Sequence, residues 1–291
     1  MDAENKLKNL VGANLQSGKL KVDAYDINYV KAGSGPNLLL LHGANIGWGQ
    51  WHLNIPELSK YFTVYAIDFP GSGFSTQIDF KKLDLERDFV AVVKEFIKLK
   101  NLRPLNIIGH SIGGWVALKI ALSGEANLEK LVLVNSLGLS ESIPFKYRLI
   151  SIFAFARLLS KTIMRPTRKN MKKFLADGMY DVGTLREEFV DYFYESVRED
   201  GYNHPFLLIS RLSGLFKMQE ELILLDELSE VRVPVLVILG DKDPLSPLSQ
   251  HRRAANLMPQ SRFEVFLNTA HVPFIEKDRE FNSLVIDFLK N

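Results

Sequence analysis

The chain of 291 residues contains no cysteine. This absence excludes disulfide bonds, thiolate metal sites and cysteine nucleophiles, and it suits a reducing compartment. An excess of charge of one sign is also missing, because 36 Lys and Arg residues and 34 Asp and Glu residues leave a formal charge of +2. We therefore expect no general attraction to nucleic acid.

Long apolar runs are missing as well. The most apolar stretches, 38–41 and 149–159, are much shorter than the roughly 20 residues of a membrane-spanning helix. Residues 1–18 mix charged and isolated apolar side chains and lack the apolar run of a signal peptide. We expect a cytoplasmic protein without a transmembrane segment.

Signals for a metal or cofactor are sparse. The six histidines, at 42, 52, 110, 204, 251 and 271, form no pair with the spacing of metal ligands. The glycines at 71 and 73 do not open a helix after a strand, as a dinucleotide-binding loop requires. We expect no metal and no other cofactor.

Short apolar segments alternate with amphipathic ones along most of the chain. Strands are predicted at 19–24, 27–30, 37–41, 63–67, 105–108, 131–135, 235–239 and 262–266. Helices are predicted at 51–61, 85–98, 113–123, 247–257 and 278–290. This alternation is typical of the α/β class with a mostly parallel, doubly wound sheet, entered here through a hairpin.

One long segment interrupts the alternation. Residues 138–228 carry helical patterning, for example at 150–163 and 185–198, and no convincing strand. A structureless loop of this length inside a compact domain is implausible. We predict a core of 1–137 and 229–291, with 138–228 inserted as a helical cap.

A serine lies in a sharp turn between a predicted strand and a predicted helix. Gly109-His-Ser111-Ile-Gly113 follows the strand at 105–108, which is the context that the G-x-S-x-G motif needs. The two glycines are required because larger side chains would collide with the crossing strand and helix. We therefore predict Ser111 as a nucleophile.

A serine hydroxyl needs a base within hydrogen-bond reach and a third group that orients the base. His271 follows the last predicted strand and Asp243 follows the one before it, so both should reach the same sheet edge as Ser111. Asp241, in the same loop as Asp243, is the rival acid. We predict Ser111, His271 and Asp243 as a catalytic triad.

Acyl transfer also needs donors for the negative charge that develops on the carbonyl oxygen. The backbone amide of Ile112 follows the nucleophile at a helix N-terminus, and that of Ala44 lies in the loop after the strand at 37–41. We predict these two amides as the oxyanion hole. His42, beside that loop, is expected to be structural.

These motifs resemble the α/β-hydrolase superfamily over residues 20–289. The matching segments, in the family's order, are Leu41-His-Gly-Ala44, the glycine-rich turn 67–75, the Ser111 turn, the loop 239–243 and His271-Val-Pro-Phe-Ile-Glu276. The resemblance implies the α/β-hydrolase fold and cofactor-free serine hydrolase chemistry.

The branch within the superfamily is weighed by single residues. Haloalkane dehalogenases and epoxide hydrolases carry an aspartate where Ser111 stands. Meta-cleavage C-C hydrolases usually carry asparagine before the nucleophile and tryptophan after the histidine, whereas this chain has His110 and Val272. Hydrolysis of carboxylic esters is the first expectation. C-C bond hydrolysis is the second, and a slow ligand-binding receptor on the same fold is the third.

The predicted cap is apolar and basic. We expect a pocket for an apolar acyl or aromatic substrate, lined by aromatic and aliphatic side chains of the cap (Phe153, Phe155, Leu158, Leu159, Phe206 and Phe216) and by Asn45, His110 and Val272.

Residues 145–173 hold nine basic residues and no acidic one: Lys146, Arg148, Arg157, Lys161, Arg165, Arg168, Lys169, Lys172 and Lys173. They form either a solvated outer face or a weak contact for an anionic membrane surface or an acidic carrier protein.

Overall fold

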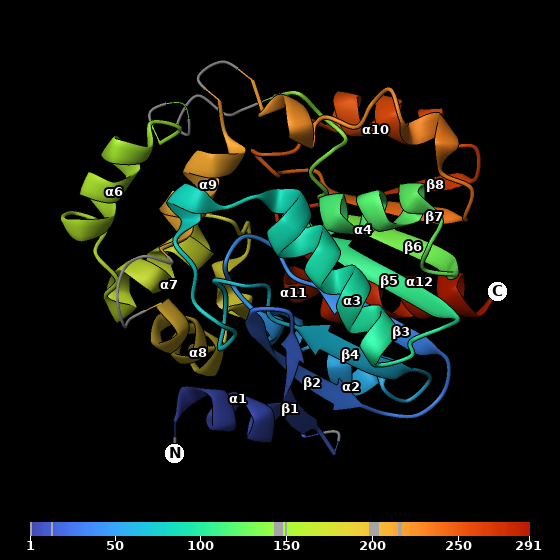
Figure 1. Ribbon diagram of the computed structural model, residues 1–291, viewed down its shortest axis with the longest axis horizontal. Coiled ribbons are helices and arrows are strands. Elements are labelled where there is room, and N and C mark those ends of the chain that lie inside the picture. Colours follow the sequence, from blue (N-terminus) through green and yellow to red (C-terminus); the bar gives the residue numbers. More distant parts are fainter. Residues whose placement is uncertain (1, 13, 143–147, 149, 198–203, 215–216) are drawn as a thin grey trace.

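The computed structural model describes every residue except 1, 13, 143–147, 149, 198–203 and 215–216. Within this part of the chain, eight strands form one sheet in the order β1-β2-β4-β3-β5-β6-β7-β8 (Figure 1). The strands are β1 (Gln16–Val22), β2 (Tyr25–Ala32), β3 (Asn37–Leu41), β4 (Thr63–Ile67), β5 (Leu105–His110), β6 (Leu128–Val134), β7 (Val235–Gly240) and β8 (Ser261–Phe266). Only the β1–β2 and β2–β4 pairs are antiparallel. The predicted hairpin and mostly parallel sheet are confirmed.

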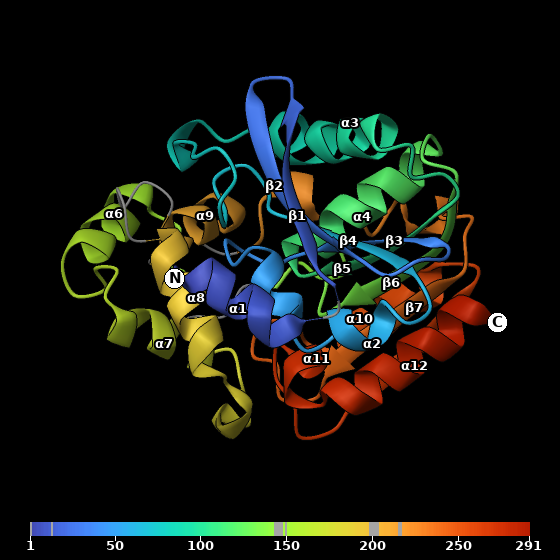
Figure 2. The same ribbon diagram turned by 90° about the horizontal axis from the view of Figure 1, so that it is seen from below.

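Helices cover both faces of the sheet, as Figure 2 shows. α3 (Val92–Leu99) and α4 (Ile112–Ser123) lie on one face. α10 (Leu248–Leu257) packs on the same face, because its Ala254 and Ala255 belong to the buried cluster that holds the inner residues of α3 and α4. α2 (Ile55–Leu58), α11 (Pro273–Glu276) and α12 (Asp278–Lys290) lie on the other. Leu39 and Leu41 of β3 belong to one buried cluster and Leu38 and Leu40 to a second, because successive side chains of a strand point to opposite faces. The run at 37–41 is apolar throughout for this reason.

Two predicted helices differ from the structure, and α1 lies where no helix was predicted. The helix expected at 51–61 is broken into a short turn, η1 (Trp48–Trp51), and α2, because Pro56 is tolerated only in the first turn of a helix. The helix expected at 85–98 starts as a π-helical segment, η3 (Glu86–Ala91), before α3. The additional helix, α1 (Ala3–Val11), is capped by the Asp2 side chain and packs against α8.

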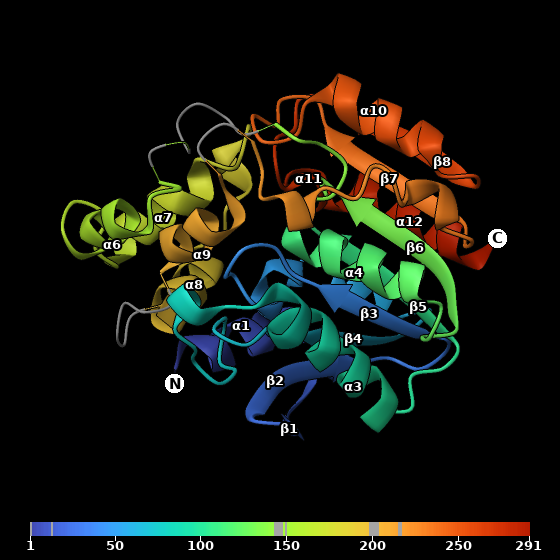
Figure 3. The same cartoon turned by 45° about the horizontal axis from the view of Figure 1, so that its top comes forward.

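The long segment between β6 and β7 is helical where it is described. It contains α6 (Phe153–Lys161), α7 (Arg168–Ala176), α8 (Glu187–Val197) and α9 (Pro205–Leu212). These helices gather at one end of the molecule (Figure 3). α6 packs on α9 and α7 packs on α8, which gives the insertion an internal framework of its own.

Candidate active site

Ser111 stands in the turn between β5 and α4 with φ 54° and ψ −118°, a conformation that a residue with a Cβ atom rarely adopts. Its backbone N–H donates to the carbonyl of Val134 at 3.0 Å. A Cβ on Gly109 would lie 2.4 Å from the carbonyl oxygen of Gly113, and one on Gly113 would lie 2.5 Å from that of Leu41. The surrounding backbone therefore demands both glycines, as the motif predicts.

Asp243 and His271 follow β7 and β8, and their side chains meet. The Nδ1 atom of His271 lies 2.8 Å from Oδ2 of Asp243, and the backbone N–H of Leu245 donates to Oδ1 at 2.8 Å. Burial by itself would raise the pKa of Asp243, but the charge and hydrogen bond of His271 outweigh it, so the pKa lies below the usual range. Asp243 is therefore ionised and aimed at the imidazole.

The rival carboxylate points elsewhere. Asp241 pairs with Lys242 at 2.9 Å and accepts a long hydrogen bond from the backbone of Thr269. Asn135, which the sequence analysis did not single out, donates from Nδ2 to Oδ2 of Asp243 at 2.6 Å. Asn135 directly follows β6, which is the strand next to β7 in the sheet. A polar residue at the carboxyl end of an apolar strand was a signal in the sequence that could have marked it as part of the site.

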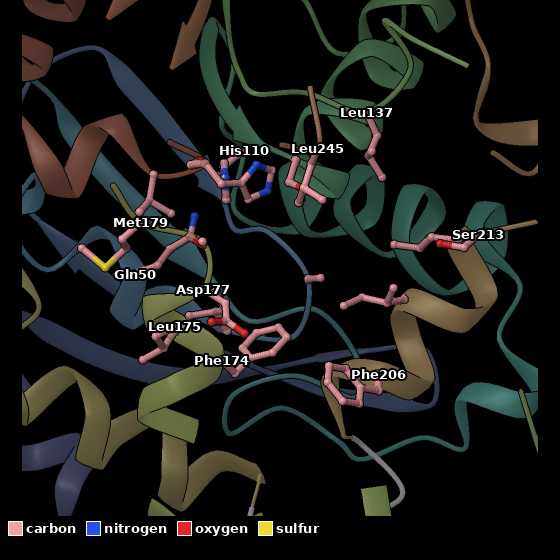
Figure 4. Close-up of a pocket in the computed structure, with 18 of the residues that line it drawn as sticks. Gln50, His110, Leu137, Phe174, Leu175, Asp177, Met179, Phe206, Ser213 and Leu245 are labelled. Carbon is pink, nitrogen blue, oxygen red and sulfur yellow. Dashed lines mark hydrogen bonds between the residues drawn. The ribbon is translucent and has the colours of Figure 1, made fainter. Parts of the chain in front are cut away.

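Ser111 and His271 line the same cavity, of about 280 Å³. Loops at the carboxyl ends of the parallel strands contribute Ala44, His110, Leu137, Leu245 and Val272 to its wall. The segment between β6 and β7 contributes Ile150, Phe174, Leu175, Met179, Phe189, Phe206, Ile209, Leu212 and Met218. The cavity thus lies between the sheet edge and the inserted helices, with a mostly apolar wall (Figure 4).

Gln50 and Asp177 are polar residues of this wall that the sequence analysis missed. Gln50 is fully buried, and its Oε1 accepts from the backbone of Gly43 at 3.1 Å. The Nε2 group of Gln50 has no hydrogen-bond partner among the described residues, so it is a donor available to a bound ligand. Asp177, at the end of α7, is the only carboxylate among the described lining residues, and none of these is Lys or Arg.

His110 lines the cavity but is already engaged. Its Nε2 donates to the backbone carbonyl of His271 at 2.9 Å, since a carbonyl can only accept. Burial holds the pKa of His110 well below its usual value, and the nearby imidazole of His271 lowers it further. His110 is therefore a neutral side chain that supports the His271 loop.

His42 has both ring nitrogens occupied. Its Nε2 accepts from the backbone of Phe69 at 2.9 Å, and its Nδ1 lies 2.6 Å from the carbonyl oxygen of Gly43. Burial lowers the pKa of His42 to about 4. These contacts agree with a structural role.

Five of the predicted pocket residues do not line the cavity. Phe155 is 37% exposed on the outside of α6, and Phe153 packs into the buried cluster beside it. Asn45 is buried in the loop after β3 with φ 59° and does not belong to the cavity wall. Leu158 and Leu159 do not line the cavity either, whereas Phe206 does. Phe216, the remaining predicted pocket residue, lies outside the described residues, as does Lys146 of the basic segment.

The two amides predicted as an oxyanion hole flank the nucleophile. Ile112 is the first residue of α4, directly after Ser111, and Ala44 lines the cavity on the opposite loop. Gly43 brings that loop close, because a Cβ there would lie 2.5 Å from Nδ1 of His110.

Backbone contacts join the His271 loop to the insertion. Glu276 accepts from the backbone of Ala270 with one carboxylate oxygen and from Tyr180 and Asp181 with the other, at 2.7 to 2.8 Å. Burial raises the pKa of Glu276, although the three N–H donors oppose this effect.

No group of three or more metal-ligating side chains gathers in the described part of the chain.

Solved structures share this fold. A variant of the meta-cleavage product hydrolase (CumD) from Pseudomonas fluorescens IP01 has a TM-score of 0.76 at 22% identity, with 94% of this chain and 97% of that chain covered. Carboxylesterase CesB from Bacillus subtilis has a TM-score of 0.80 at 19% identity, with 99% and 95% covered.

Curated relatives span nearly the whole chain. The 2-hydroxy-6-oxo-2,4-heptadienoate hydrolase of Pseudomonas putida is 24% identical, with 96% of both sequences covered. A 2-hydroxy-6-oxononadienedioate/2-hydroxy-6-oxononatrienedioate hydrolase of Burkholderia vietnamiensis is 29% identical, with 91% of both covered. The pimeloyl-[acyl-carrier protein] methyl ester esterase of Pseudoalteromonas atlantica is 26% identical, with 89% of this chain and 95% of that one covered.

The relatives are thus C-C bond hydrolases and esterases, which agrees with the two branches weighed from the sequence. The family model described as alpha/beta hydrolase fold matches residues 36–278. This match confirms the fold class and the resemblance, and the chain belongs to the α/β-hydrolase fold family.

Proposed function

We propose that the protein hydrolyses carboxylic esters with an apolar acyl or aromatic part and no negative charge, with residues 138–228 as a cap over the site. The observation that carries this proposal is the cavity wall, which is mostly apolar and holds Asp177 but no Lys or Arg among its described residues. An anionic substrate would lack a cationic partner there and would be repelled by Asp177.

The first half of the reaction forms an acyl-enzyme. The hydroxyl oxygen of Ser111 attacks the ester carbonyl while Nε2 of His271 takes its proton, and Asp243 stabilises the imidazolium through Nδ1. The 2.8 Å contact between His271 and Asp243 supports this assignment. The imidazolium then gives its proton to the leaving alcohol as the bond between the carbonyl carbon and the alcohol oxygen breaks.

The second half releases the acid. His271 takes a proton from water, the hydroxide attacks the acyl-enzyme, and the proton returns to Ser111 as the carboxylic acid leaves. In both halves the oxyanion is assigned to the backbone N–H groups of Ile112 and Ala44. Their fixed positions at a helix N-terminus and in a tightly packed loop suit this role, because they need no reorganisation.

Hydrolysis of a C-C bond beside a carbonyl is the second candidate, because the relatives above include dienoate hydrolases. Those names denote substrates that carry a carboxylate group. The cavity wall of this chain favours a neutral ester over such an anion. The residues His110 and Val272 also depart from the asparagine and tryptophan typical of that branch.

Turnover of p-nitrophenyl esters from acetate to dodecanoate tests the proposal. Ser111→Ala should lower kcat by about 10⁴-fold or more, with a burst of p-nitrophenolate in the unmodified protein only. Ser123→Ala, at the other end of α4, is the matched control and should keep full activity.

The same preparations should be offered a 2-hydroxy-6-oxo-dienoate. A higher kcat/KM for this acid than for any ester would replace the proposal with C-C hydrolysis. Tight binding of an ester or of the dienoate without turnover of either would favour the third expectation, a ligand-binding receptor on the same fold.

A further inference from the structure

The outside of α6 exposes large apolar side chains. Ile152 is 47% exposed, Phe155 37% and Leu158 58%, and Ile163, just beyond the helix, is 76% exposed. In all three ribbon views α6 is the outermost helix on the side opposite the C-terminus (Figures 1–3). Contiguous exposed apolar side chains on a soluble domain mark a contact surface.

Basic side chains lie in the same short stretch. Residues 150–173 contain no Asp or Glu. Arg168 and Lys172 pair with Glu187 and Asp191 of α8. Within the described part of the chain, no carboxylate pairs with Lys161, Arg165, Lys169 or Lys173, all of which are exposed. The segment thus keeps four positive charges beside its apolar side chains.

The inner side of α6 is already occupied. Ala156 and Ser160 are buried, and the helix packs on α9. The apolar residues Phe155 and Leu158 are three residues apart, so they lie next to each other on the remaining, outer side, with Lys161 one turn further on. Within the part of the chain that the structure describes, this surface is therefore left exposed.

We propose that this outer surface, formed by Ile152, Phe155, Leu158, Lys161, Ile163 and Arg165, docks on an anionic phospholipid bilayer. A bilayer surface accepts both components at once, because its headgroups attract the basic side chains and its acyl boundary takes up the apolar ones. Acidic side chains of a protein would pair with the basic residues but would not bury the exposed apolar side chains of Ile163 and Leu158. No described helix is long and apolar enough to cross a membrane, so the contact is peripheral.

Docking has a consequence for substrate access. α9, which packs on α6, supplies Phe206, Ile209 and Leu212 to the cavity wall. A docked molecule thus holds its cavity one helix away from the lipid. We therefore expect the preferred substrates to be esters that partition into bilayers. This expectation rests on the proposed function, whereas the docking itself does not.

Co-sedimentation with vesicles tests the docking separately from catalysis. The full chain carrying Ser111→Ala should bind vesicles of about one part phosphatidylglycerol to two parts phosphatidylcholine at least about tenfold more tightly than vesicles of phosphatidylcholine alone. Binding should weaken as salt is raised. Equal affinity for the two compositions, or no binding to either, would overturn the proposal.

Two double variants locate the contact. Lys161→Gln with Arg165→Gln, and Leu158→Gln with Ile163→Gln, should each weaken binding about tenfold or more. The matched controls remove one lysine with one arginine, and two large aliphatic residues, at remote exposed positions: Lys19→Gln with Arg103→Gln and Leu99→Gln with Leu267→Gln. Both should bind unchanged. Circular dichroism verifies folding. Equal losses in test and control pairs would contradict the assignment to α6.

The absence of cysteine allows a direct readout. Ile163→Cys and Leu267→Cys, each labelled with an environment-sensitive fluorophore, report from α6 and from a remote site. We expect a blue shift on adding the anionic vesicles for the label at 163 and none at 267. A shift at neither position, or the same shift at both, would refute docking through α6.

Discussion

The backbone N–H of His271 donates a hydrogen bond of 2.9 Å to the carbonyl oxygen of Gly178. This contact joins the proposed base to the segment that follows α7, nearly a hundred residues earlier in the chain. The inserted helices therefore do more than cover the cavity, because the position of His271 depends on how they sit.

Glu276 strengthens that connection, and Glu276→Gln should weaken it. A carboxylate accepts from Ala270 on one oxygen and from Tyr180 and Asp181 on the other, whereas an amide loses one of these acceptors. Leaving buried N–H groups unpaired should lower the free energy of unfolding by about 2 kcal/mol. Urea denaturation measures this loss, and kcat should fall while KM changes less.

The control for this variant is Glu280→Gln. Glu280 is mostly exposed on α12, and its ion pair among the described residues is with Lys277. Losses of the same size in both variants would show that Glu276 has no special role.

Asp243→Asn should lower kcat by about 10³- to 10⁴-fold, because an amide neither fixes the imidazole tautomer nor stabilises the imidazolium. Asp241→Asn changes the neighbouring carboxylate in the same loop, which contacts Lys242 rather than His271. It should keep activity within a few-fold. Steady-state kinetics with the best ester decides, and a larger loss in Asp241→Asn would reverse the assignment of the acid.

Gly43→Ala should disrupt the site sterically. The added Cβ would lie 2.5 Å from Nδ1 of His110, which is buried and tied to the carbonyl of His271. We expect kcat/KM to fall at least about tenfold as the loop and His110 move apart. Gly124→Ala, at the far end of α4, is the control: its Cβ would meet nothing within 4 Å, so kcat/KM should stay unchanged, although the φ of 68° at this position lowers stability.

Acid should destabilise the protein between pH 6.5 and about 4. Burial lowers the pKa values of His42, His52 and His204 from 6.5 to about 4. In this window the unfolded chain binds protons that the folded chain does not, so the free energy of unfolding falls as pH falls, by about 3 kcal/mol for each histidine. Urea denaturation from pH 7 downward measures the slope.

Asp68 acts in the opposite direction. Burial raises its pKa from 3.8 to about 7, so the folded chain binds the extra proton in this window and acid stabilises it. Removing that group with Asp68→Asn should make the acid sensitivity steeper. A stability that stays constant between pH 7 and 4 in the unmodified protein would refute burial of neutral histidines.

The proposed triad could be put together from the sequence because each member follows a predicted strand. Ser111 comes directly after β5, Asp243 three residues after β7 and His271 five residues after β8, and parallel strands end at one edge of the sheet. The sequence also indicated the glycines at 109 and 113, since backbone crowding leaves no room for a side chain.

The cavity wall could not be predicted in the same way. α6 has apolar residues on more than one side, so its pattern did not reveal that Phe155 faces outward and Phe153 inward. Gln50 and Asp177 reach the cavity only once the insertion is docked on the sheet edge. Such long-range placement leaves no local pattern in the sequence.

Strands β6 and β7 are neighbours in the sheet, and the backbone of Asn135 still donates to Ile238 at 2.9 Å. The chain therefore leaves the sheet at the carboxyl end of β6 and re-enters it at the amino end of the neighbouring parallel strand β7, although about a hundred residues separate the two strands in sequence. An excursion closed in this way can be lengthened, shortened or exchanged during evolution without altering the sheet, provided that the backbone contacts of Gly178, Tyr180 and Asp181 with the His271 loop are kept. Grafting the corresponding segment of another family member between these two strands is thus a natural route to new specificity.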